Sequence, residues 1–581
     1  MKTKIKYSIV VLVWATLLTA CKDDFLDRYP QSEISSQQFF NTEKDLELFT
    51  NGFYSAFPED DIYMSDFTSD NVDISGLSEV LNGTRIIPTS AASAGWTWQP
   101  LYNINYFLDH YNKPAIAAEA RNHYSGIARF FRAYFYFEKL KRFGDVPFYN
   151  KPLNEQSPEL YKARDPRTLV TDSIIADLDY AIANLRIAKT PGRVNKWAAL
   201  AFKSRVCLFE GTFRKYHDEF NLPGADALLQ TAAAAADLFM RTSPYKLATG
   251  TSSTVYLNLF SSQTPNADEY ILTTLYALAV NRSHVANAIF TSPTRNNPGI
   301  TKSLVDSYLM SDGRPFSALP NYDKLSFFSE VQNRDPRLSQ TIRTPGYRRI
   351  NASLATAALV PDYANTFTGY QNIKFVSTPD QDAAAYTPLP LIRFAEVLLN
   401  YAEAKAELQQ LTQVEADRSI NLVRARTGVP KLLVNLIPND PVIRAQYIHT
   451  ADPVILEVRR ERRIELVMEG FRYYDLMRWK EGHLLAEKFK GVYFPSKGLF
   501  DLDGDGKNDL AVVDVRPTPP ASGIQYLVLG TDKALSNGIS GNVIVHDKLV
   551  KKFDESKDYL HPLPLNELTL NKNLAQNPGW K

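Results

Sequence analysis

The sequence predicts a mainly α-helical protein whose helices pair, with a large loop-rich region and few short strands. Apolar residues recur at steps of three, four or seven over several long segments, which is the period of an amphipathic helix. These segments come in pairs of roughly 35–45 residues, a length typical of helical hairpins that stack side by side. Stretches rich in Gly, Pro, Asn, Ser and Thr separate the helices and indicate extended loops.

The clearest helical periodicity lies in the first half of the chain. A first helix is expected over Phe39–Phe57, whose apolar residues fall near one face, and Pro58 ends it. Residues 116–143 contain the segment Arg129–Phe137, which is apolar nearly all round and therefore predicts a helix buried between neighbours. Further helices are expected over 96–111, 166–187, 196–216 and 224–241.

Residues 37–244 therefore form an N-terminal helical-repeat part, and its pairs resemble tetratricopeptide-like hairpins. Within this part, residues 58–95 have no clear period and are rich in Asp, Ser, Asn, Gly and Thr. Long loops in a compact domain are usually functional or disordered, so residues 58–95 are the candidate ligand loop.

The C-terminal part, residues 245–581, begins with a loop-rich insertion over residues 245–385. Short strands are expected there at Tyr270–Leu272 and Phe375–Val376, since both are short apolar runs bounded by turn residues. After residue 490 the chain is expected to be loop and short strand. Between residues 391 and 480 helices are expected over 391–408, 414–427 and 454–480.

The helix expected over 454–480 has four glutamates at a strict four-residue spacing: Glu457, Glu461, Glu465 and Glu469. Like charges so placed repel each other, so cations must lie nearby. Arginines of the same segment, between Arg459 and Arg463, can supply some of them. The row is either a carboxylate site or, as we favour, a support stabilised by salt bridges.

Residues 1–20 have the pattern of a bacterial export signal. Lysines at positions 2, 4 and 6 precede an apolar core that is too short to span a bilayer as a permanent helix. The run Leu18–Cys21 resembles the lipobox of bacterial lipoproteins, in which the cysteine is diacylated and the signal is cut before it. Two acyl chains anchor a soluble domain stably, and residues 21–36 would then be a lipid-anchored leader. The alternative is an ordinary signal in which Cys21 is incidental.

Composition and motifs exclude several classes of function. The 65 basic and 64 acidic residues leave no net field that would attract nucleic acid or an anionic membrane. The chain has two cysteines, Cys21 and Cys207, so lipidation of the first would rule out an intrachain disulfide. The eight histidines are isolated, and the sequence has no HExxH, P-loop or GxSxG motif. We therefore expect no enzymatic activity.

A calcium site is predicted in the C-terminal tail. Asp501, Asp503, Asp505 and Asp509 occupy positions 1, 3, 5 and 9 of a calcium loop, with Gly506 at the turn. In such a loop Lys507 would bind the ion through its backbone carbonyl oxygen. Val512 stands where a bidentate glutamate is usual, and Asp514 is the candidate substitute. The alternative is a surface turn rich in aspartate.

Passages along nearly the whole chain resemble the SusD/RagB family of outer-membrane lipoproteins. They are Phe25–Asp27 after the lipobox, Arg129–Phe137 running into Arg142–Pro147, Gly192–Val194, Asp312–Arg314, Asn333–Leu338, Thr368–Tyr370, Leu391–Ala404, Asn421–Gly428 and Glu461–Leu466. The resemblance implies a tetratricopeptide-like scaffold with a loop-rich ligand-binding face. It also implies a lipoprotein that faces the cell exterior, captures an oligosaccharide and delivers it to a SusC-like TonB-dependent transporter.

Glycan binding requires flat aromatic faces and planar polar groups, which points to residues in or beside the candidate ligand loop. Trp96 and Trp98 lie where this loop enters a helix, and we expect them to diverge on that helix so that one of them faces the ligand. Tyr63 and Arg85 lie in the loop itself. Two alternatives remain, a peptide-capturing lipoprotein of the RagB type and a surface glycoside hydrolase with two carboxyl groups flanking a cleft.

Overall fold

The computed structural model describes residues 39–351, 360–530 and 533–580. The expected signal (1–20) and the whole of the expected leader (21–36), with Cys21, lie outside these residues. The described chain is mainly α-helical with few short strands, which confirms the predicted fold class. Within the described ranges, no helix has both the length and the apolar character needed to cross a bilayer.

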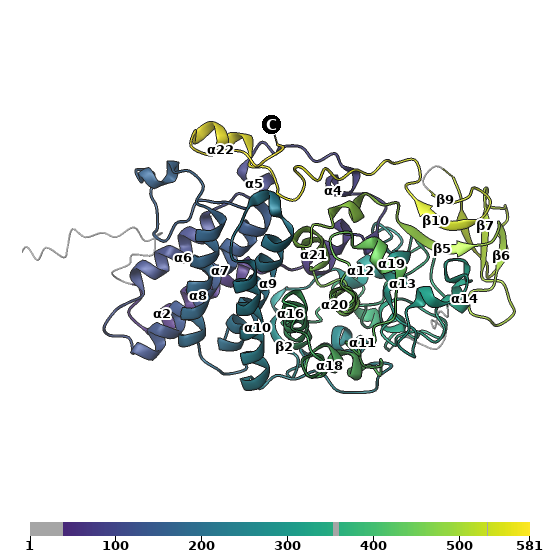
Figure 1. Ribbon diagram of the computed structural model, residues 1–581, viewed down its shortest axis with the longest axis horizontal. Coiled ribbons are helices and arrows are strands. Elements are labelled where there is room, and N and C mark those ends of the chain that lie inside the picture. Colours follow the sequence, from purple (N-terminus) through teal and green to yellow (C-terminus); the bar gives the residue numbers. More distant parts are fainter. Residues whose placement is uncertain (1–38, 352–359, 531–532, 581) are drawn as a thin grey trace, which may run out of the picture.

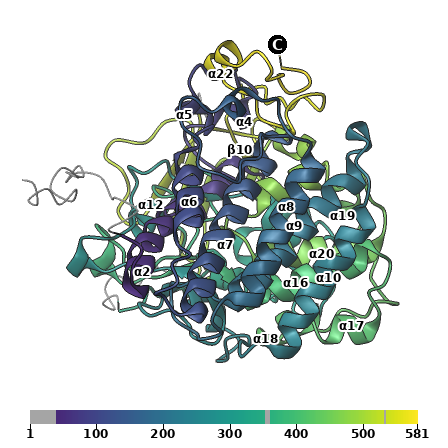
Figure 2. The ribbon, with the colours of Figure 1, turned by 90° about the vertical axis from the view of Figure 1, so that its left-hand side faces the viewer.

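Long helices stand side by side through the N-terminal half, as Figures 1 and 2 show. From the second helix of the row onward, neighbours in sequence pack against each other, the first helix packs on the third, and the last helix of this half packs on a helix from the C-terminal half. The row consists of α2 (Glu43–Asn51), α6 (Gln99–His110), α7 (Ala118–Phe143), α8 (Arg167–Asn184), α9 (Lys196–Tyr216), α10 (Ala225–Thr242) and α16 (Phe394–Glu407).

Local sequence sets the ends of these helices. At the start of α2, the Thr42 side chain accepts a hydrogen bond from the Asp45 backbone N–H, and the Asp45 carboxylate accepts from Thr42 in return. At the start of α9, the Asn195 side chain accepts from the Ala198 N–H. Helix α7 ends at Gly144, whose φ of 73° is favourable for glycine. The ranges predicted from residue 96 to 241 differ from the observed helices by only a few residues, whereas the helix expected over 39–57 is α-helical only over Glu43–Asn51 and continues as a 3-10 helix over Gly52–Ala56.

Two predictions about helices of the C-terminal half were wrong in detail. The helix expected over 414–427 is divided into α17 (Gln413–Asp417) and α18 (Ile420–Arg426). The helix expected over 454–480 is divided into α20 (Pro453–Glu465) and α21 (Arg472–Arg478). Met468, between them, has a φ of 61°, which a right-handed helix cannot contain.

The loop-rich insertion contains only short elements. Tyr270–Leu272 lies in strand β2 (Tyr270–Thr274), as predicted, whereas Phe375 has a φ of 66° and lies in a turn, so no strand forms at Phe375–Val376. The remaining short helices lie in this insertion and in other parts of the described chain. They are α3 (Asp61–Met64), α4 (Glu79–Asn82), α5 (Ala91–Ala94), α11 (Val255–Ser261), α12 (Ala286–Thr291), α13 (Lys302–Ser307), α14 (Phe327–Glu330), α15 (Leu338–Thr341), α19 (Pro441–Gln446) and α22 (Leu565–Leu570).

The strands of the described residues form four small sheets. β1 (Val72–Asp73) pairs with β3 (Gly299–Ile300), and β2 pairs with β4 (Leu389–Arg393), both antiparallel. The other two sheets lie at the end of the molecule far from the helical row (Figure 1). One has the order β5 (Lys490–Phe494), β10 (Gly541–Val545), β9 (Lys533–Leu535), and the other β6 (Gly498–Phe500), β7 (Leu510–Val513), β8 (Gln525–Val528).

Buried ion pairs join α20 and the residue Glu469 that follows it to the loop-rich insertion and to the segment 393–426. The pairs are Glu457 with Arg424 and Arg460, Glu461 with Arg337 and Arg424, Glu465 with Arg337, Arg393 and Arg426, and Glu469 with Lys374 and Arg393. The support stabilised by salt bridges is therefore confirmed. Among the described residues, Arg460 is the one cation paired with these glutamates that lies on α20 itself. The other paired cations come from distant segments, and Glu469 follows the end of α20.

The C-terminal tail returns to the helical row. Figure 1 shows α22 beside α5, and backbone hydrogen bonds run from Leu565 N–H to the Pro88 oxygen and from Asn566 N–H to the Thr89 oxygen. The Asn577 side chain donates to the Phe143 oxygen at 3.0 Å. The tail therefore covers the entrance to α6, where the two tryptophans singled out in the sequence lie.

Candidate ligand-binding cleft

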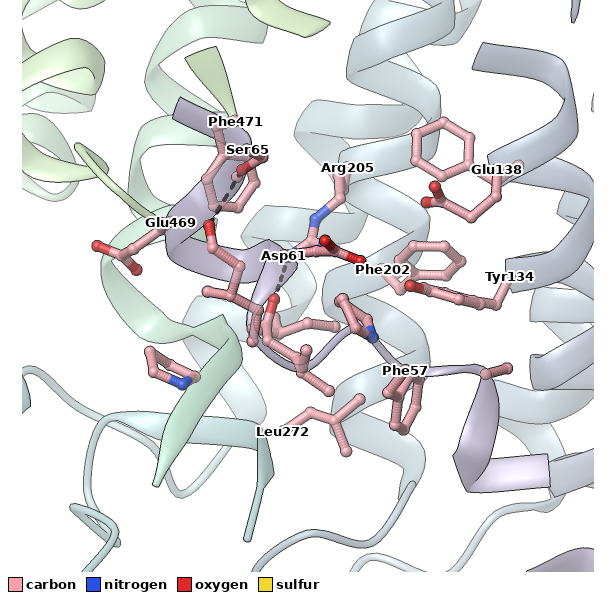
Figure 3. Close-up of a pocket in the computed structure, with 18 of the residues that line it drawn as sticks. Phe57, Asp61, Ser65, Tyr134, Glu138, Phe202, Arg205, Leu272, Glu469 and Phe471 are labelled. Carbon is pink, nitrogen blue, oxygen red and sulfur yellow. Dashed lines mark hydrogen bonds between the residues drawn. The ribbon is translucent and has the colours of Figure 1, made fainter. Parts of the chain in front are cut away.

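A large cavity, about 1090 Å³, opens between the helical row and the C-terminal half. Figure 3 shows its walls. Helices α7 and α9 form one wall, while residues 51–65 and the segment 462–478 form the opposite wall. A volume at the upper end of the range for small-molecule pockets leaves room for several sugar rings.

Helical spacing brings aromatic residues to this wall. On α7, Phe130, Tyr134 and Phe137 are separated by four and three residues, so they share one face. On α9, Phe202 lies on the face that meets them, and its ring centroid is 5.6 Å from that of Tyr134. Phe57 closes the group from residues 51–65, with its centroid 4.9 Å from that of Phe131. Phe130, Phe137 and Phe202 are at most 2% exposed, so the half-buried Tyr134 presents the ring surface on this side of the cleft.

Polar groups are placed around these rings. Arg205 on α9 donates from Nε to the Glu396 Oε1 at 2.6 Å and from Nη2 to the Leu391 oxygen at 2.6 Å, which holds its guanidinium still. The guanidinium carbon lies 5.0 Å from the centre of the Phe471 ring. Glu138 on α7 pairs with Lys141 at 2.8 Å and remains partly exposed.

The Tyr134 hydroxyl is held neutral and available. Burial, followed by the Glu138 carboxylate, raises its pKa well above the ordinary value. In the part of the chain that the structure describes, this hydroxyl has no hydrogen-bond partner. Figure 3 shows it directed toward Asp61, an exposed carboxylate on the opposite wall. A ligand hydroxyl between the two could accept from Tyr134 and donate to Asp61.

Trp96 and Trp98 line a separate and smaller pocket of about 260 Å³ beside the C-terminal tail. Both precede α6, and their ring centroids are 5.3 Å apart, so they do not diverge on a helix as expected. Trp96 is 2% exposed, and its ring stands edge-on to Phe143. Trp98 is half-buried and lies 5.4 Å from Tyr149 in the pocket wall.

Tyr63 and Arg85 do not lie with the two tryptophans: Tyr63 is buried, and the half-buried Arg85 is engaged by other protein groups. Tyr63 is fully buried, its hydroxyl donates to Asp60, and its ring packs 6.0 Å from that of Phe290. Arg85 donates to the Asp558 carboxylate at 2.8 Å and lies over the Trp580 ring. Neither lies in the pocket of the two tryptophans, because the residue spacing of a loop does not determine which side chains converge.

The predicted calcium loop brings three of its four aspartates together. Carboxylate oxygens of Asp501, Asp503 and Asp509 lie within 4.8 Å of one another. Asp505 instead pairs with the Lys507 ammonium at 3.0 Å. Burial, followed by the neighbouring carboxylates Asp503 and Asp501, raises the pKa of Asp509.

The backbone around this loop fits an ion site in part. The Asp501 carboxylate accepts from the N–H groups of Gly504 and Gly506 at 2.7 and 2.8 Å, and both glycines have a positive φ. Asp514, the candidate substitute at the last position, pairs with Lys497 at 2.7 Å. Calcium prefers oxygen ligands of this kind, but the last position of the loop is not supplied by Asp514 in this conformation.

Sequence reasoning missed the residues of the large cleft. Tyr134 lies in the segment Arg129–Phe137 that was predicted to be buried, Phe202 was not singled out, and aromatic spacing on a buried helix gives no sign of a cavity. Asp61 and Phe471 are more than 400 residues apart in sequence, so the sequence could not predict that they lie in the same wall of the cleft. The one signal available was the exposure expected for residues 58–95, which begin where Phe57 and Pro58 line the cleft.

Known proteins place this architecture in one family. The sequence profile of the SusD family matches residues 268–580, and a profile described as starch-binding associating with outer membrane matches residues 24–208. SusD-like protein P2 of Formosa agariphila is 24% identical over 609 residues, covering 99% of this chain and all of that protein. SusD-like protein P38 of the same organism is also 24% identical, over 490 residues, covering 82% of this chain and 91% of that protein.

Solved structures show the same fold. A SusD-like protein of Bacteroides fragilis superposes with a TM-score of 0.69 at 22% identity, covering 95% of this chain and all of the other. A SusD-like carbohydrate-binding protein of the same organism gives a TM-score of 0.68 at 23% identity, covering 93% of this chain and all of the other. The fold and its cleft define a helical-repeat binding protein. The chain belongs to the SusD family.

Proposed function

We propose that this chain is a non-enzymatic, cell-surface lipoprotein that captures an oligosaccharide in the large cleft and delivers it to a SusC-like TonB-dependent transporter. The observation that carries the proposal is the pairing of aromatic rings with an unbonded phenol and an exposed carboxylate at Tyr134 and Asp61. Sugar rings present apolar C–H faces to such rings and hydroxyls to such polar groups.

The proposal about membrane attachment rests on Cys21. A diacylated cysteine would anchor the chain at the outer membrane, with residues 21–36 as the leader. The name of the family profile over residues 24–208 supports an outer-membrane association. A partner in the same membrane would then meet the protein over an interface of at least about 1,000 Å².

Binding to a glycan array tests the proposal. We expect the lipidated protein to bind at least one neutral oligosaccharide family, and the Tyr134→Ala variant to lose most of that binding. Binding of peptides instead of glycans would favour a capture protein of the RagB type. Release of reducing sugar from the bound glycan by wild-type protein would contradict the non-enzymatic role.

Isolation from native membranes tests the transporter partnership. In mild detergent, affinity purification of the chain should recover a large outer-membrane β-barrel protein in near-stoichiometric amount. The Cys21→Ser protein, expressed at the same level, is the matched control for contacts that form only after lysis. Repeated recovery of the wild-type chain alone would contradict the partnership.

A further inference from the structure

In the described chain, every cation in the wall of the large cleft is paired with a carboxylate. Five lysine and arginine side chains of the described residues line this wall, and two of them, Arg462 and Arg478, are buried. The pairs are Lys141 with Glu138, Arg205 with Glu396, Arg282 with Glu59, Arg462 with Asp475 and Arg478 with Glu403. A negatively charged ligand would therefore find no unpaired cation in the described wall.

Two carboxylates of the same wall have no cation beside them. Asp60 and Asp61 lie at the start of α3 and line the cleft, and within the described ranges neither forms an ion pair. The Asp60 carboxylate accepts a hydrogen bond from the hydroxyl of Tyr63, which brings no charge. Asp61 is exposed to water, so burial does not oppose its negative charge. The wall therefore presents negative charge that no described cation compensates.

The pair of Lys141 and Glu138 presents its carboxylate to the cleft more than its ammonium. The Glu138 side chain is 42% exposed, whereas that of Lys141 is 13% exposed and its ammonium lies over aromatic rings. Figure 3 shows Asp61 and Glu138 directed into the space beside Tyr134. Burial raises the pKa of Tyr134 most, and Glu138 and Asp61 add to the rise. Both carboxylates therefore act at the point where the ligand is proposed to bind.

Arg205 acts in the opposite direction on the pKa of Tyr134, but its charge is already neutralised. Its guanidinium donates to both carboxylate oxygens of Glu396, at 2.6 and 2.7 Å. Hydrogen bonds between two charged groups are stronger than neutral ones, so an anionic ligand would have to displace a buried and well-bound carboxylate. The exposed pair of Arg282 and Glu59 likewise adds no net charge.

Ligands of different charge should meet this wall differently. Hydroxyl groups can donate hydrogen bonds to the free carboxylate of Asp61, and an ammonium group is also attracted to it. A carboxylate or sulfate group is repelled instead. Two like unit charges about 5 Å apart in water repel each other enough to lower affinity roughly fourfold.

We infer that the large cleft excludes anionic glycans and admits neutral or amine-bearing ones, with Asp61 as the residue that determines this specificity. That the occupant is a glycan rests on the proposed function. The uncompensated negative charge does not, because it follows from the ion pairs of the wall.

A glycan array on the full lipidated chain in mild detergent gives the first test. Oligosaccharides of alginate, polygalacturonate and chondroitin sulfate are the anionic probes, and they are compared with neutral oligosaccharides on the same array. We expect none of the anionic probes to bind through the cleft. An anionic probe that binds wild type and loses that binding in Tyr134→Ala would overturn the inference.

A matched pair of ligands gives the second test. In the neutral oligosaccharide that binds, the primary alcohol group of one ring at a time is converted to a carboxylate and, separately, to a primary amide. The two groups have nearly the same shape and differ in charge. At one ring or more, titration calorimetry should find the amide at least about fourfold tighter than the carboxylate.

Asp61→Asn should bring the ratio of these two affinities close to one, because it removes the negative charge and keeps the shape of the side chain. Asp226→Asn is the matched control, since Asp226 is also exposed and in the first turn of a helix but lies outside the cleft wall, and it should keep the wild-type ratio. Equal affinity of amide and carboxylate at every ring, or an unchanged ratio in folded Asp61→Asn, would overturn the inference.

Salt repeats the test without any variant, so a poorly folding Asp61→Asn does not remove it. Raising sodium chloride from about 0.05 M to about 1 M screens exposed charges and should narrow the difference between amide and carboxylate. A difference that does not change with salt would show that shape rather than charge causes it, and would also overturn the inference.

Failure of this inference can be told apart from failure of the proposed function. Binding of an anionic probe that depends on Tyr134 would leave the cleft as the glycan site and remove only the charge preference. Absence of binding by every glycan, neutral or charged, would contradict both.

Discussion

The ring of Tyr134 stands at 89° to the ring of Phe57, with centroids 5.3 Å apart. One ring comes from the long helix α7 and the other from the segment that leads into the candidate ligand loop. This edge-to-face contact fixes the orientation of the Tyr134 phenol toward the large cleft. The two segments that border the cleft therefore contact each other at this point.

Replacement of Tyr134 is expected to weaken glycan binding by an amount that depends on what is removed. Tyr134→Phe keeps the ring and loses one neutral hydrogen bond, which is worth about 1 kcal/mol or roughly fivefold in affinity. Tyr134→Ala also removes the aromatic face, for a loss of about 2 kcal/mol or more. Titration calorimetry measures both. If Tyr134→Phe and Tyr134→Ala bind as wild type does, the glycan site lies elsewhere.

The two tryptophans are expected to behave differently. Trp96→Ala removes a fully packed ring and should lower the free energy of unfolding by about 3–5 kcal/mol. Trp98→Ala should cost less stability, because its ring is half-buried. We propose that Trp98, rather than Trp96, contacts ligand in the smaller pocket. Denaturant unfolding and glycan titration on both variants separate the two effects, and stronger loss of binding in a folded Trp96→Ala protein would contradict this assignment.

Removal of calcium is expected to loosen the 501–509 loop. Three carboxylates within 4.8 Å repel one another unless a cation neutralises them. Chelator should therefore lower the melting temperature of the wild-type protein, and Asp503→Ala should abolish the effect of chelator. Asp547→Asn, at a half-buried aspartate outside the loop that pairs with Lys488, serves as the control. Identical melting curves with and without chelator would leave only the turn interpretation.

Stability is expected to fall as Asp66 loses its proton. Burial raises the pKa of this carboxyl to about 6, although Asn71 and the Met468 N–H stabilise the charged form. Because the folded pKa lies above the ordinary 3.8, the native state binds the proton more tightly than the unfolded state. The resulting stability is complete below about pH 4 and is lost as the pH rises through 6. The shift corresponds to about 3 kcal/mol.

The Asp66→Asn variant isolates that contribution. Between pH 4 and pH 7, the wild-type protein should lose more unfolding free energy than the variant does, measured by urea titration at each pH. Asp172→Asn, an exposed substitution in α8, should follow the wild-type curve. Parallel curves for wild type and Asp66→Asn would show that the buried carboxyl does not titrate in this range.

Lipid attachment is expected to depend on Cys21. Cys21→Ser should leave a precursor that keeps its signal and a protein that does not sediment with membranes. Mass spectrometry of the N-terminal peptide and protease shaving of intact cells measure the two consequences. Cys207→Ser, at a buried thiol, controls for loss of a cysteine as such. Normal anchoring and surface exposure of Cys21→Ser would contradict the lipobox interpretation.

The sequence by itself determined the helices of the row and the class of the fold. Periodic apolar residues, a capping box at Thr42 and Asp45 and a glycine at position 144 act over a few residues, so they can be read locally. The same reasoning found the row of glutamates from Glu457 and predicted that cations must surround it, because repulsion within one helix depends only on local spacing.

Tertiary structure alone decided which residues meet. Most cations paired with those glutamates come from remote segments. The positive φ of Met468 separates α20 from α21, where periodicity predicted one continuous helix. Tyr134 lines a cavity between the helical row and the C-terminal half. Tyr63, by contrast, is buried against Phe290 and Phe375. The burial of a side chain and the convergence of side chains on one site depend on contacts between residues far apart in the chain, so local residue spacing does not predict them.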